Sequence, residues 1–114
     1  MGERANVIVQ YGNDQVVLYS HWAGEDLIKT VHKALSLRER WNDFQYLTAI
    51  IFRKMIQDYS SLDGTQDVGI SNKVWDSNYP SIIVNVDRQK INLEDKQEVT
   101  FADFVEDVHL IQTS

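Results

Sequence analysis

At 114 residues, with 43% hydrophobic and 25% charged side chains, the chain has the length and composition of a single globular domain, which argues against a disordered segment. The absence of cysteine excludes disulfides, thiolate zinc sites and cysteine nucleophiles, and it favours a cytoplasmic setting. The net charge of −6 arises in residues 58–114, which hold eleven acidic and four basic side chains, so nucleic-acid binding is disfavoured.

Alternation of apolar and polar residues predicts a β-hairpin at the N-terminus. Over Ala5–Tyr11, Val7 and Val9 share one face of a strand. Gly12-Asn13-Asp14 supplies residues that tolerate a positive φ in a turn. Gln15–Trp22 alternates again and reads as the return strand.

At Gly24 the apolar spacing becomes helical. Leu27, Ile28, Val31 and Leu35 recur every three or four positions, which predicts a first helix. A second helix is predicted to run from about Asp43 to Tyr59. Its apolar stripe is broader than one core contact needs, so the helix is either sandwiched or part of a subunit interface. The stripe contains Phe44, Leu47, Ile50, Ile51, Phe52, Met55, Ile56 and Tyr59.

Residues 60–80 carry loop signals, and strand patterns return after Pro80. A third strand is predicted around Ile82, Val84 and Val86, and a fourth around Ile91 and Leu93. Thr100 is placed to cap the amide of Asp103 at the start of a short closing helix. The order ββααββα predicts one α+β domain over residues 1–114, with an antiparallel sheet packed on helices.

The segment Leu18–Asp26 brings a hydroxyl, an imidazole and an indole to the junction between a strand and a helix. A small-ligand or hydrolytic pocket is therefore one hypothesis. Ser20 and His21 are sequence neighbours and lie on opposite faces of a strand, so they do not form a nucleophile and base pair. The plain alternative is a histidine that fixes the corner between hairpin and helix. The candidate ligand-binding residues are His21, Trp22 and Gly24, with Asp43 and Tyr46 folding nearby.

The three tryptophans each stand at the boundary of a predicted element. We interpret Trp22 and Trp41 as core residues that fill corners, with the indole N–H reaching a carbonyl. Trp75 stands among polar loop residues, so a core role and a role in a protein interface both stay open. The candidate interface residues are Phe52, Ile56, Tyr59 and Trp75.

Several common chemistries find no matching pattern. His21, His32 and His109 share no metal-ligand spacing, and the five glycines form neither a phosphate loop nor a dinucleotide fingerprint. We expect no metal and no cofactor. The N-terminus shows no secretory signal, and no apolar run reaches the ~18 residues that span a bilayer, so we expect no membrane partner.

Three hypotheses for function follow. The first is a non-enzymatic intracellular domain that contacts a protein partner or a second copy of itself through the broad second helix. The second is the ligand or hydrolytic pocket at the corner of His21 and Trp22. The third is an acidic protein that mimics nucleic acid or counters a defence system, which requires the carboxylates of residues 58–114 to line one surface.

Five stretches also carry a resemblance to a known family. They are Leu18-Tyr19-Ser20-His21-Trp22-Ala23-Gly24-Glu25, Arg40-Trp41-Asn42-Asp43 with Tyr46-Leu47 and Ile50-Ile51-Phe52, Gly69-Ile70-Ser71, Tyr79-Pro80, and Phe101-Ala102-Asp103-Phe104-Val105. With these, the chain resembles a small family of prokaryotic and bacteriophage-borne proteins of unknown function, with Ala23 where a second glycine is expected. The resemblance implies a phage or mobile-element context, and no activity, cofactor or catalytic residue.

Overall fold

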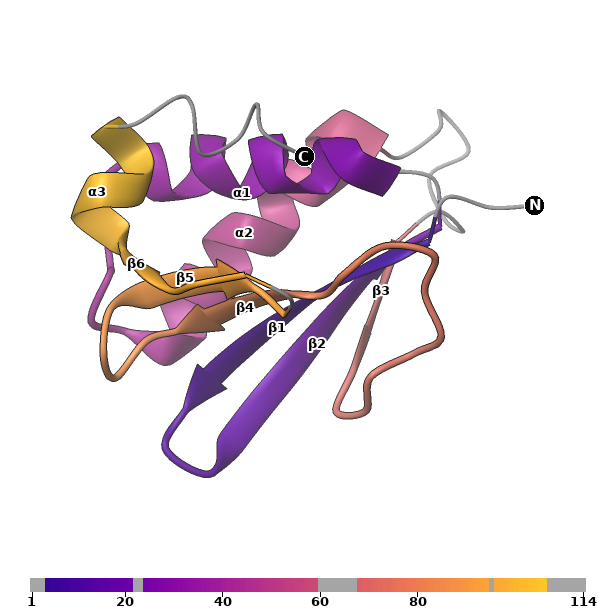
Figure 1. Cartoon of the computed structure of the whole chain (residues 1–114), viewed down its shortest axis with the longest axis horizontal. Coiled ribbons are helices and arrows are strands. Elements are labelled where there is room, and N and C mark those ends of the chain that lie inside the picture. The colour runs from indigo at the N-terminus through magenta and orange to yellow at the C-terminus, as the bar shows by residue number, and fades with distance from the viewer. Residues whose placement is uncertain (1–3, 22–23, 60–67, 95, 107–114) are drawn as a thin grey trace.

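The computed structural model describes residues 4–21, 24–59, 68–94 and 96–106, and it has an α+β fold with a six-stranded sheet and three α-helices (Figure 1). The strands are β1 (Ala5–Tyr11), β2 (Asp14–Ser20), β3 (Val68–Ser71), β4 (Ile82–Asn85), β5 (Lys90–Leu93) and β6 (Val99–Thr100). The helices are α1 (Leu27–Ser36), α2 (Phe44–Tyr59) and α3 (Phe101–Glu106), and a 3-10 turn, η1 (Gly24–Asp26), precedes α1.

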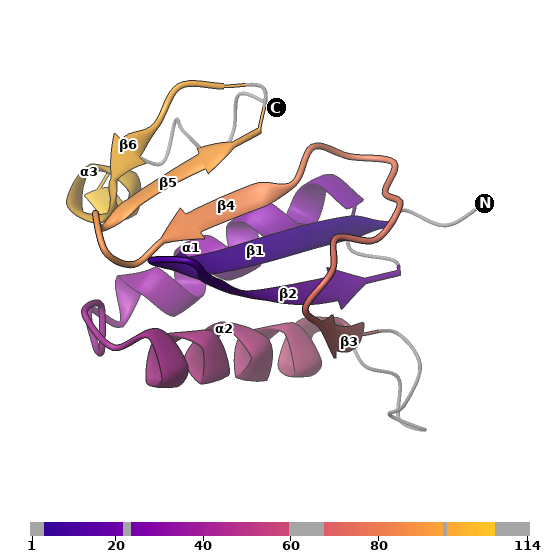
Figure 2. The same ribbon diagram turned by 90° about the horizontal axis from the view of Figure 1, so that it is seen from below.

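The strands lie in the order β3-β2-β1-β4-β5-β6 (Figure 2). Neighbouring strands are antiparallel except β1 and β4, which run parallel. The predicted α+β class and the order of the main elements are confirmed, but the prediction of a purely antiparallel sheet is wrong. The two hairpins β1–β2 and β4–β5 join through β1 and β4, and this pairing depends on a crossover connection that local patterns do not encode.

Two strands were absent from the prediction. β3 lies within residues 60–80, which the sequence marked as a loop, and β6 has only two residues. Both are too short to show a clear alternation, and Gly69 interrupts the pattern of β3. β3 and β6 are the two edge strands of the sheet. Without them, the sequence prediction did not identify the edges of the sheet.

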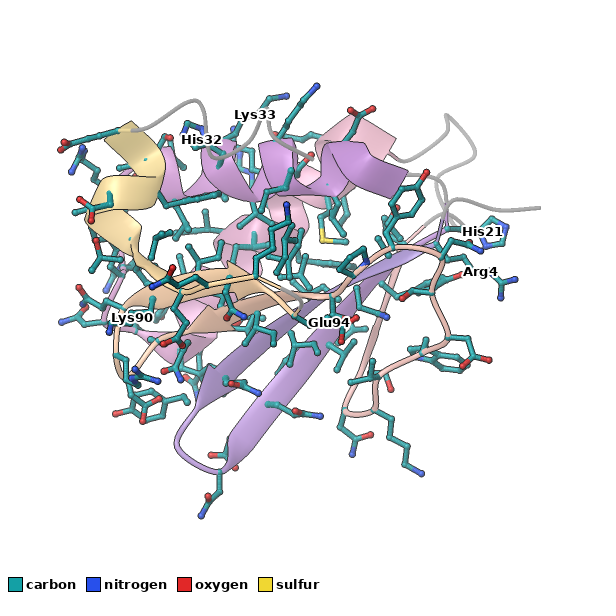
Figure 3. All side chains as sticks on the ribbon, viewed as in Figure 1. Arg4, His21, His32, Lys33, Lys90 and Glu94 are labelled. Atoms are coloured by element: carbon teal, nitrogen blue, oxygen red, sulfur yellow. The ribbon has the colours of Figure 1, made fainter. Side chains whose placement is uncertain are left out.

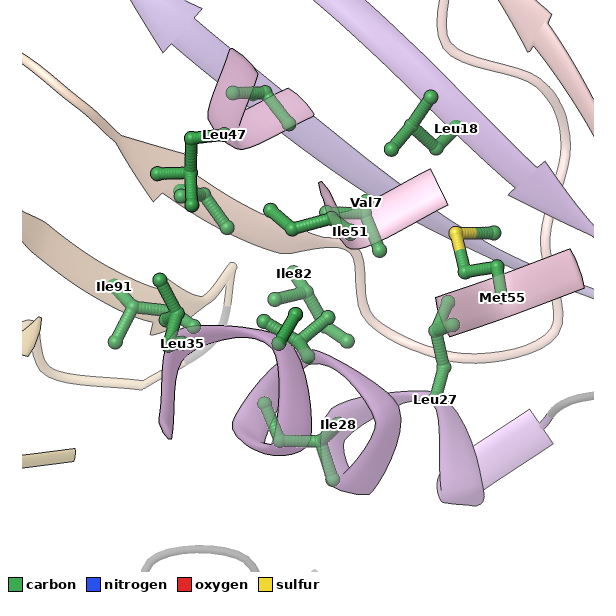
Figure 4. Packing of buried hydrophobic residues seen from close by; sticks show 14 of the residues in the cluster. Val7, Leu18, Leu27, Ile28, Leu35, Leu47, Ile51, Met55, Ile82 and Ile91 are labelled. Atoms are coloured by element: carbon green, nitrogen blue, oxygen red, sulfur yellow. The ribbon is translucent and has the colours of Figure 1, made fainter. Parts of the chain in front are cut away.

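The hydrophobic core lies between one face of the sheet, here called the inner face, and helices α1 and α2 (Figure 4). Alternate residues of β1, β2, β4 and β5 point to this face because side chains alternate along a strand. Helical residues three and four positions apart face them from above. The largest fully buried side chains of this core are Phe101, Leu18, Leu27, Leu35, Leu47, Ile51, Met55, Ile91, Val7, Val9 and Val31.

The opposite, outer face of the sheet is crossed by the segment that joins β3 to β4. This segment has to pass beneath β2 and β1 because β3 and β4 lie on opposite sides of that hairpin. The side chain of Asn6 donates from Nδ2 to the carbonyl of Trp75 at 2.7 Å, and Gln15 donates from Nε2 to the carbonyl of Asn72 at 3.1 Å. These bonds fix the connection against the sheet.

The closing helix confirms the predicted cap. The amide of Asp103 donates to the Thr100 Oγ1 at 3.1 Å, as a residue three positions into a helix does with an N-cap side chain. Trp41 likewise behaves as predicted, since it packs beside the core and its Nε1 donates to the carbonyl of Leu35 at 3.0 Å. Among the described helices, none is long and apolar enough to cross a membrane.

Candidate functional site

His21 follows the last residue of β2 and is held by a neighbour on the same strand. The Tyr19 hydroxyl and the His21 Nδ1 share a hydrogen bond at 2.9 Å. The two side chains meet because residues two apart share one face of a strand. Arg4 lies at the same end of the β1–β2 hairpin as His21 (Figure 3). Ala5 pairs with Ser20, so one further residue along each strand places Arg4 opposite His21. Trp22 lies outside the described residues.

Gly24 has a backbone reason for being glycine. Its φ is +56°, in the left-handed region that side chains disfavour, and it starts the 3-10 turn before α1. The positive φ therefore explains why a glycine stands at position 24, without any role in ligand binding.

Asp43 and Tyr46 lie at the start of α2. The Asp43 Oδ1 accepts a hydrogen bond from the amide of Tyr46 at 3.2 Å, which caps the helix, and the Arg40 guanidinium lies 4.7 Å from the centre of the Tyr46 ring. Phe44, which follows Asp43 in the sequence, stacks on Tyr11 beside the β1–β2 turn at a distance of 5.8 Å between ring centroids.

His21 is at the other end of β2 from that turn. The seven residues of β2 separate the two places by about 20 Å, at roughly 3.3 Å per residue. The structure therefore does not bring Asp43 or Tyr46 to His21, so these three predicted ligand-binding residues do not line one pocket.

The candidate interface residues of α2 lie next to β3. An apolar groove of about 440 Å³, here called the inner hollow, separates the end of α2 from β3 on the inner face of the sheet. Ile56 is 43% exposed and Ile70 is 62% exposed, although both are large apolar side chains. The side chain of Tyr59 lies outside the described part of the chain. The lining residues of the inner hollow are Leu18, Thr48, Ala49, Phe52, Arg53, Ile56, Gln57 and Ile70.

A second concavity, here called the outer hollow, lies beside β3 on the outer face of the sheet. It has a volume of about 300 Å³ and is lined by Arg4, Tyr19, Gly69, Ile70 and Trp75. The rings of Tyr19 and Trp75 lie 6.2 Å apart at an angle of 48°, and Trp75 is 58% exposed. The Nε of Arg4 is buried and has no hydrogen-bond partner among the described residues.

Between the two hollows lies an edge strand. Within the part of the chain that the structure describes, β3 pairs with β2 and with no strand on its other side. Its residues, Val68 to Ser71, include neither a charged side chain nor proline, the usual protections of an exposed edge. We call β3 with the inner and outer hollows the β3 edge.

Sequence reasoning missed Arg4 and Ile70 as site residues. Arg4 stands before the first predicted strand, and Ile70 stands in what reads as a loop. The alternation of Val68, Gly69 and Ile70 was the one available signal for a strand there, and the glycine weakened it.

No match was found when the chain was compared with protein-family models, with curated proteins and with solved structures. The resemblance to a phage-borne family thus stays a prediction.

The described carboxylates lie outside the two hollows, although Asp76 directly follows Trp75. No aspartate or glutamate lines either hollow among the described residues. Many described carboxylates instead make contacts within the chain; those of Asp87, Glu94, Glu98 and Glu106 belong to residues 58–114, and their contacts favour a structural role over a surface that mimics nucleic acid. These contacts join Asp26 to Lys29, Glu106 to Arg38, Asp43 to Arg40, Glu98 to Arg88, Asp87 to the amide of Gly12, and Glu94 to the amide of Ser81.

The other hollows and the polar side chains of the described residues form weaker candidates for a functional site. Two further hollows near β5 have volumes of about 90 and 50 Å³, well below the roughly 300 Å³ at which ligand sites begin. In residues 4–21, 24–59, 68–94 and 96–106, no group of three or more histidine, aspartate or glutamate side chains is arranged to hold a metal ion. The β3 edge is thus the best candidate site that the structure offers.

Proposed function

We propose that this chain is a non-enzymatic protein-interaction domain whose contact surface is the β3 edge. The observation that carries the proposal is an edge strand without charged residues or proline, bordered by the exposed Ile56 and Ile70. An unpaired strand offers main-chain hydrogen bonds to another chain, and exposed apolar side chains beside it gain free energy when they are covered. Both features favour a protein as the occupant.

The setting of this function is part of the proposal. The absence of cysteine supports a cytoplasmic location, and the resemblance of segments such as Leu18–Glu25 supports a phage or mobile-element context. A partner protein and a second copy of the chain are both compatible with a contact through α2 and β3.

Site-specific photo-crosslinking in the full chain tests this function. A photoreactive phenylalanine analogue replaces Ile56 in one variant and Ala102, an exposed residue of α3, in the matched control. We expect a crosslinked protein species from position 56 in cells of the native host and none from position 102. Equal crosslinking at both positions, or none at position 56, contradicts the proposed surface.

A small ligand in the outer hollow is the second candidate function. Arg4, whose buried Nε has no acceptor among the described residues, and the tilted rings of Tyr19 and Trp75 line this hollow and favour it. Native mass spectrometry of the protein purified from its host distinguishes the two functions. A retained small molecule that Trp75→Ala releases and Ile56→Asp retains supports the ligand site, whereas a retained protein supports the interaction domain.

A further inference from the structure

We propose that the β3 edge binds an extended segment of a partner protein by strand addition, with an apolar side chain of that segment in the inner hollow and a neighbouring acidic side chain in the outer hollow. This inference rests on the proposed function and adds the conformation and the side-chain chemistry of the partner.

The backbone of β3 supplies the first part of the site. It is fixed in an extended conformation by antiparallel pairing with β2, in which Leu18 faces Ile70 and Tyr19 faces Gly69. On the side away from β2, an extended strand of four residues directs about four backbone N–H and C=O groups outward. A segment lying beside β3 satisfies these groups and continues the sheet by one strand.

The two hollows lie at the same level of the edge. Ile70 lines both, and the inner hollow contains Leu18 while the outer hollow contains its neighbour Tyr19. Successive side chains of an added strand point to opposite faces of the sheet. Two consecutive residues of a bound segment therefore reach one hollow each.

The inner hollow selects an apolar residue. Its lining includes Phe52, Ile56 and Ile70, beside the buried Leu18 of the hydrophobic core. A leucine, isoleucine or phenylalanine placed there covers exposed apolar surface on both partners, which is favourable at about 25 cal/mol per Å².

The outer hollow selects a carboxylate. The side chain of Arg4 lines this hollow, and its buried Nε has no acceptor in the described chain. An incoming aspartate or glutamate forms a charge-assisted pair with the accessible part of this guanidinium group. The hollows contain Arg4 and Arg53 and no described carboxylate, so an acidic side chain placed in the outer hollow has a cationic group beside it.

A second copy of the chain fits this edge less well. A symmetric contact presents the same surface from both sides, so it brings a second Arg4 and a second Arg53 to the interface and no carboxylate from the hollows. β3 carries no carboxylate, so pairing of two β3 strands also brings no acidic partner to the Arg4 side chain. A separate acidic and apolar segment is therefore the better complement.

Fluorescence polarisation with synthetic peptides tests the inference on the full chain. The probe is a fluorescein-labelled peptide with the core Thr-Glu-Leu-Glu-Thr, whose symmetry serves both strand directions. The matched probes carry Gln-Leu-Gln or Glu-Ala-Glu at the centre. We expect the Glu-Leu-Glu peptide to bind at least about tenfold more tightly than either, a ratio equivalent to about 1.4 kcal/mol.

Variants of the protein and of the peptide backbone locate the contact. We expect Arg4→Gln to reduce the preference for glutamate over glutamine to less than about threefold, whereas the control Arg88→Gln, in the distant β4–β5 turn, retains it. Methylation of alternate backbone nitrogens in the peptide abolishes binding in one register and not in the other if strand addition occurs. This last comparison uses the unchanged protein, so it does not depend on any variant folding.

The outcomes separate this inference from the proposed function. Equal affinity for the glutamate and glutamine peptides, indifference to N-methylation, or no binding up to about 1 mM overturns strand addition by an acidic segment. If crosslinking from position 56 succeeds while the peptides fail, the interaction domain stands with a different occupant. A dimer in sedimentation that Ile56→Asp dissociates, without peptide binding, identifies that occupant as a second copy.

Discussion

Ile51 and Ile56, on the same helix, provide a test of how α2 is oriented. Ile51 is fully buried and Ile56 is 43% exposed at the inner hollow. Replacement of either by alanine removes three methylene equivalents, about 2.4 kcal/mol when fully buried. At Ile51 a cavity term raises the total to about 3–4 kcal/mol, whereas at Ile56 the buried fraction gives about 1.4 kcal/mol at most and leaves no enclosed cavity. The higher helix propensity of alanine lowers both values by a few tenths.

Urea denaturation followed by circular dichroism and tryptophan fluorescence measures the difference. With an m-value of about 1.5 kcal/mol/M, Ile51→Ala lowers the midpoint by about 2 M and Ile56→Ala by less than about 1 M. Unchanged m-values show that both variants unfold from the same native state. Equal losses of stability, or a larger loss for Ile56→Ala, would refute the orientation that exposes Ile56 beside β3.

Two further predictions concern local geometry. Thr100→Ala removes the acceptor for the Asp103 amide and should lower the free energy of unfolding by about 1 kcal/mol, whereas Thr100→Ser retains the cap; no loss with alanine in urea denaturation would contradict this role. Gln89 has a φ of +52°, so Gln89→Gly should relieve left-handed strain and raise stability by about 0.5 kcal/mol after the greater chain entropy of glycine is subtracted. The control Gln89→Ala retains the strain and should give no gain in thermal denaturation; a glycine variant less stable than this control would count against the argument.

Features that depend on nearby residues were predictable from the sequence. The β1–β2 hairpin, both long helices and the β4–β5 hairpin follow from periodicity. The cap formed by Thr100 involves residues only three positions apart. Each of these signals is complete within one short stretch of chain.

Features that depend on distant residues were not predictable. Parallel pairing of Val7 with Ile82 joins positions 75 apart, and no local pattern specifies it. The outer hollow needs Arg4, Tyr19 and Trp75 to converge from three separate segments of the chain, and β3 is too short and too interrupted by Gly69 to be recognised. The predicted corner pocket does not assemble, because the length of β2 keeps Asp43 and His21 apart.

The measurement that tests the central claim most directly is a chemical-shift map of the ¹⁵N-labelled chain titrated with the Glu-Leu-Glu peptide. The β3 edge as contact surface predicts the largest amide shifts in Val68–Ser71, in Tyr19 and in the segment of α2 that includes Phe52 and Ile56. Shifts that gather at α3 or at the start of α2, with β3 unchanged, would contradict it.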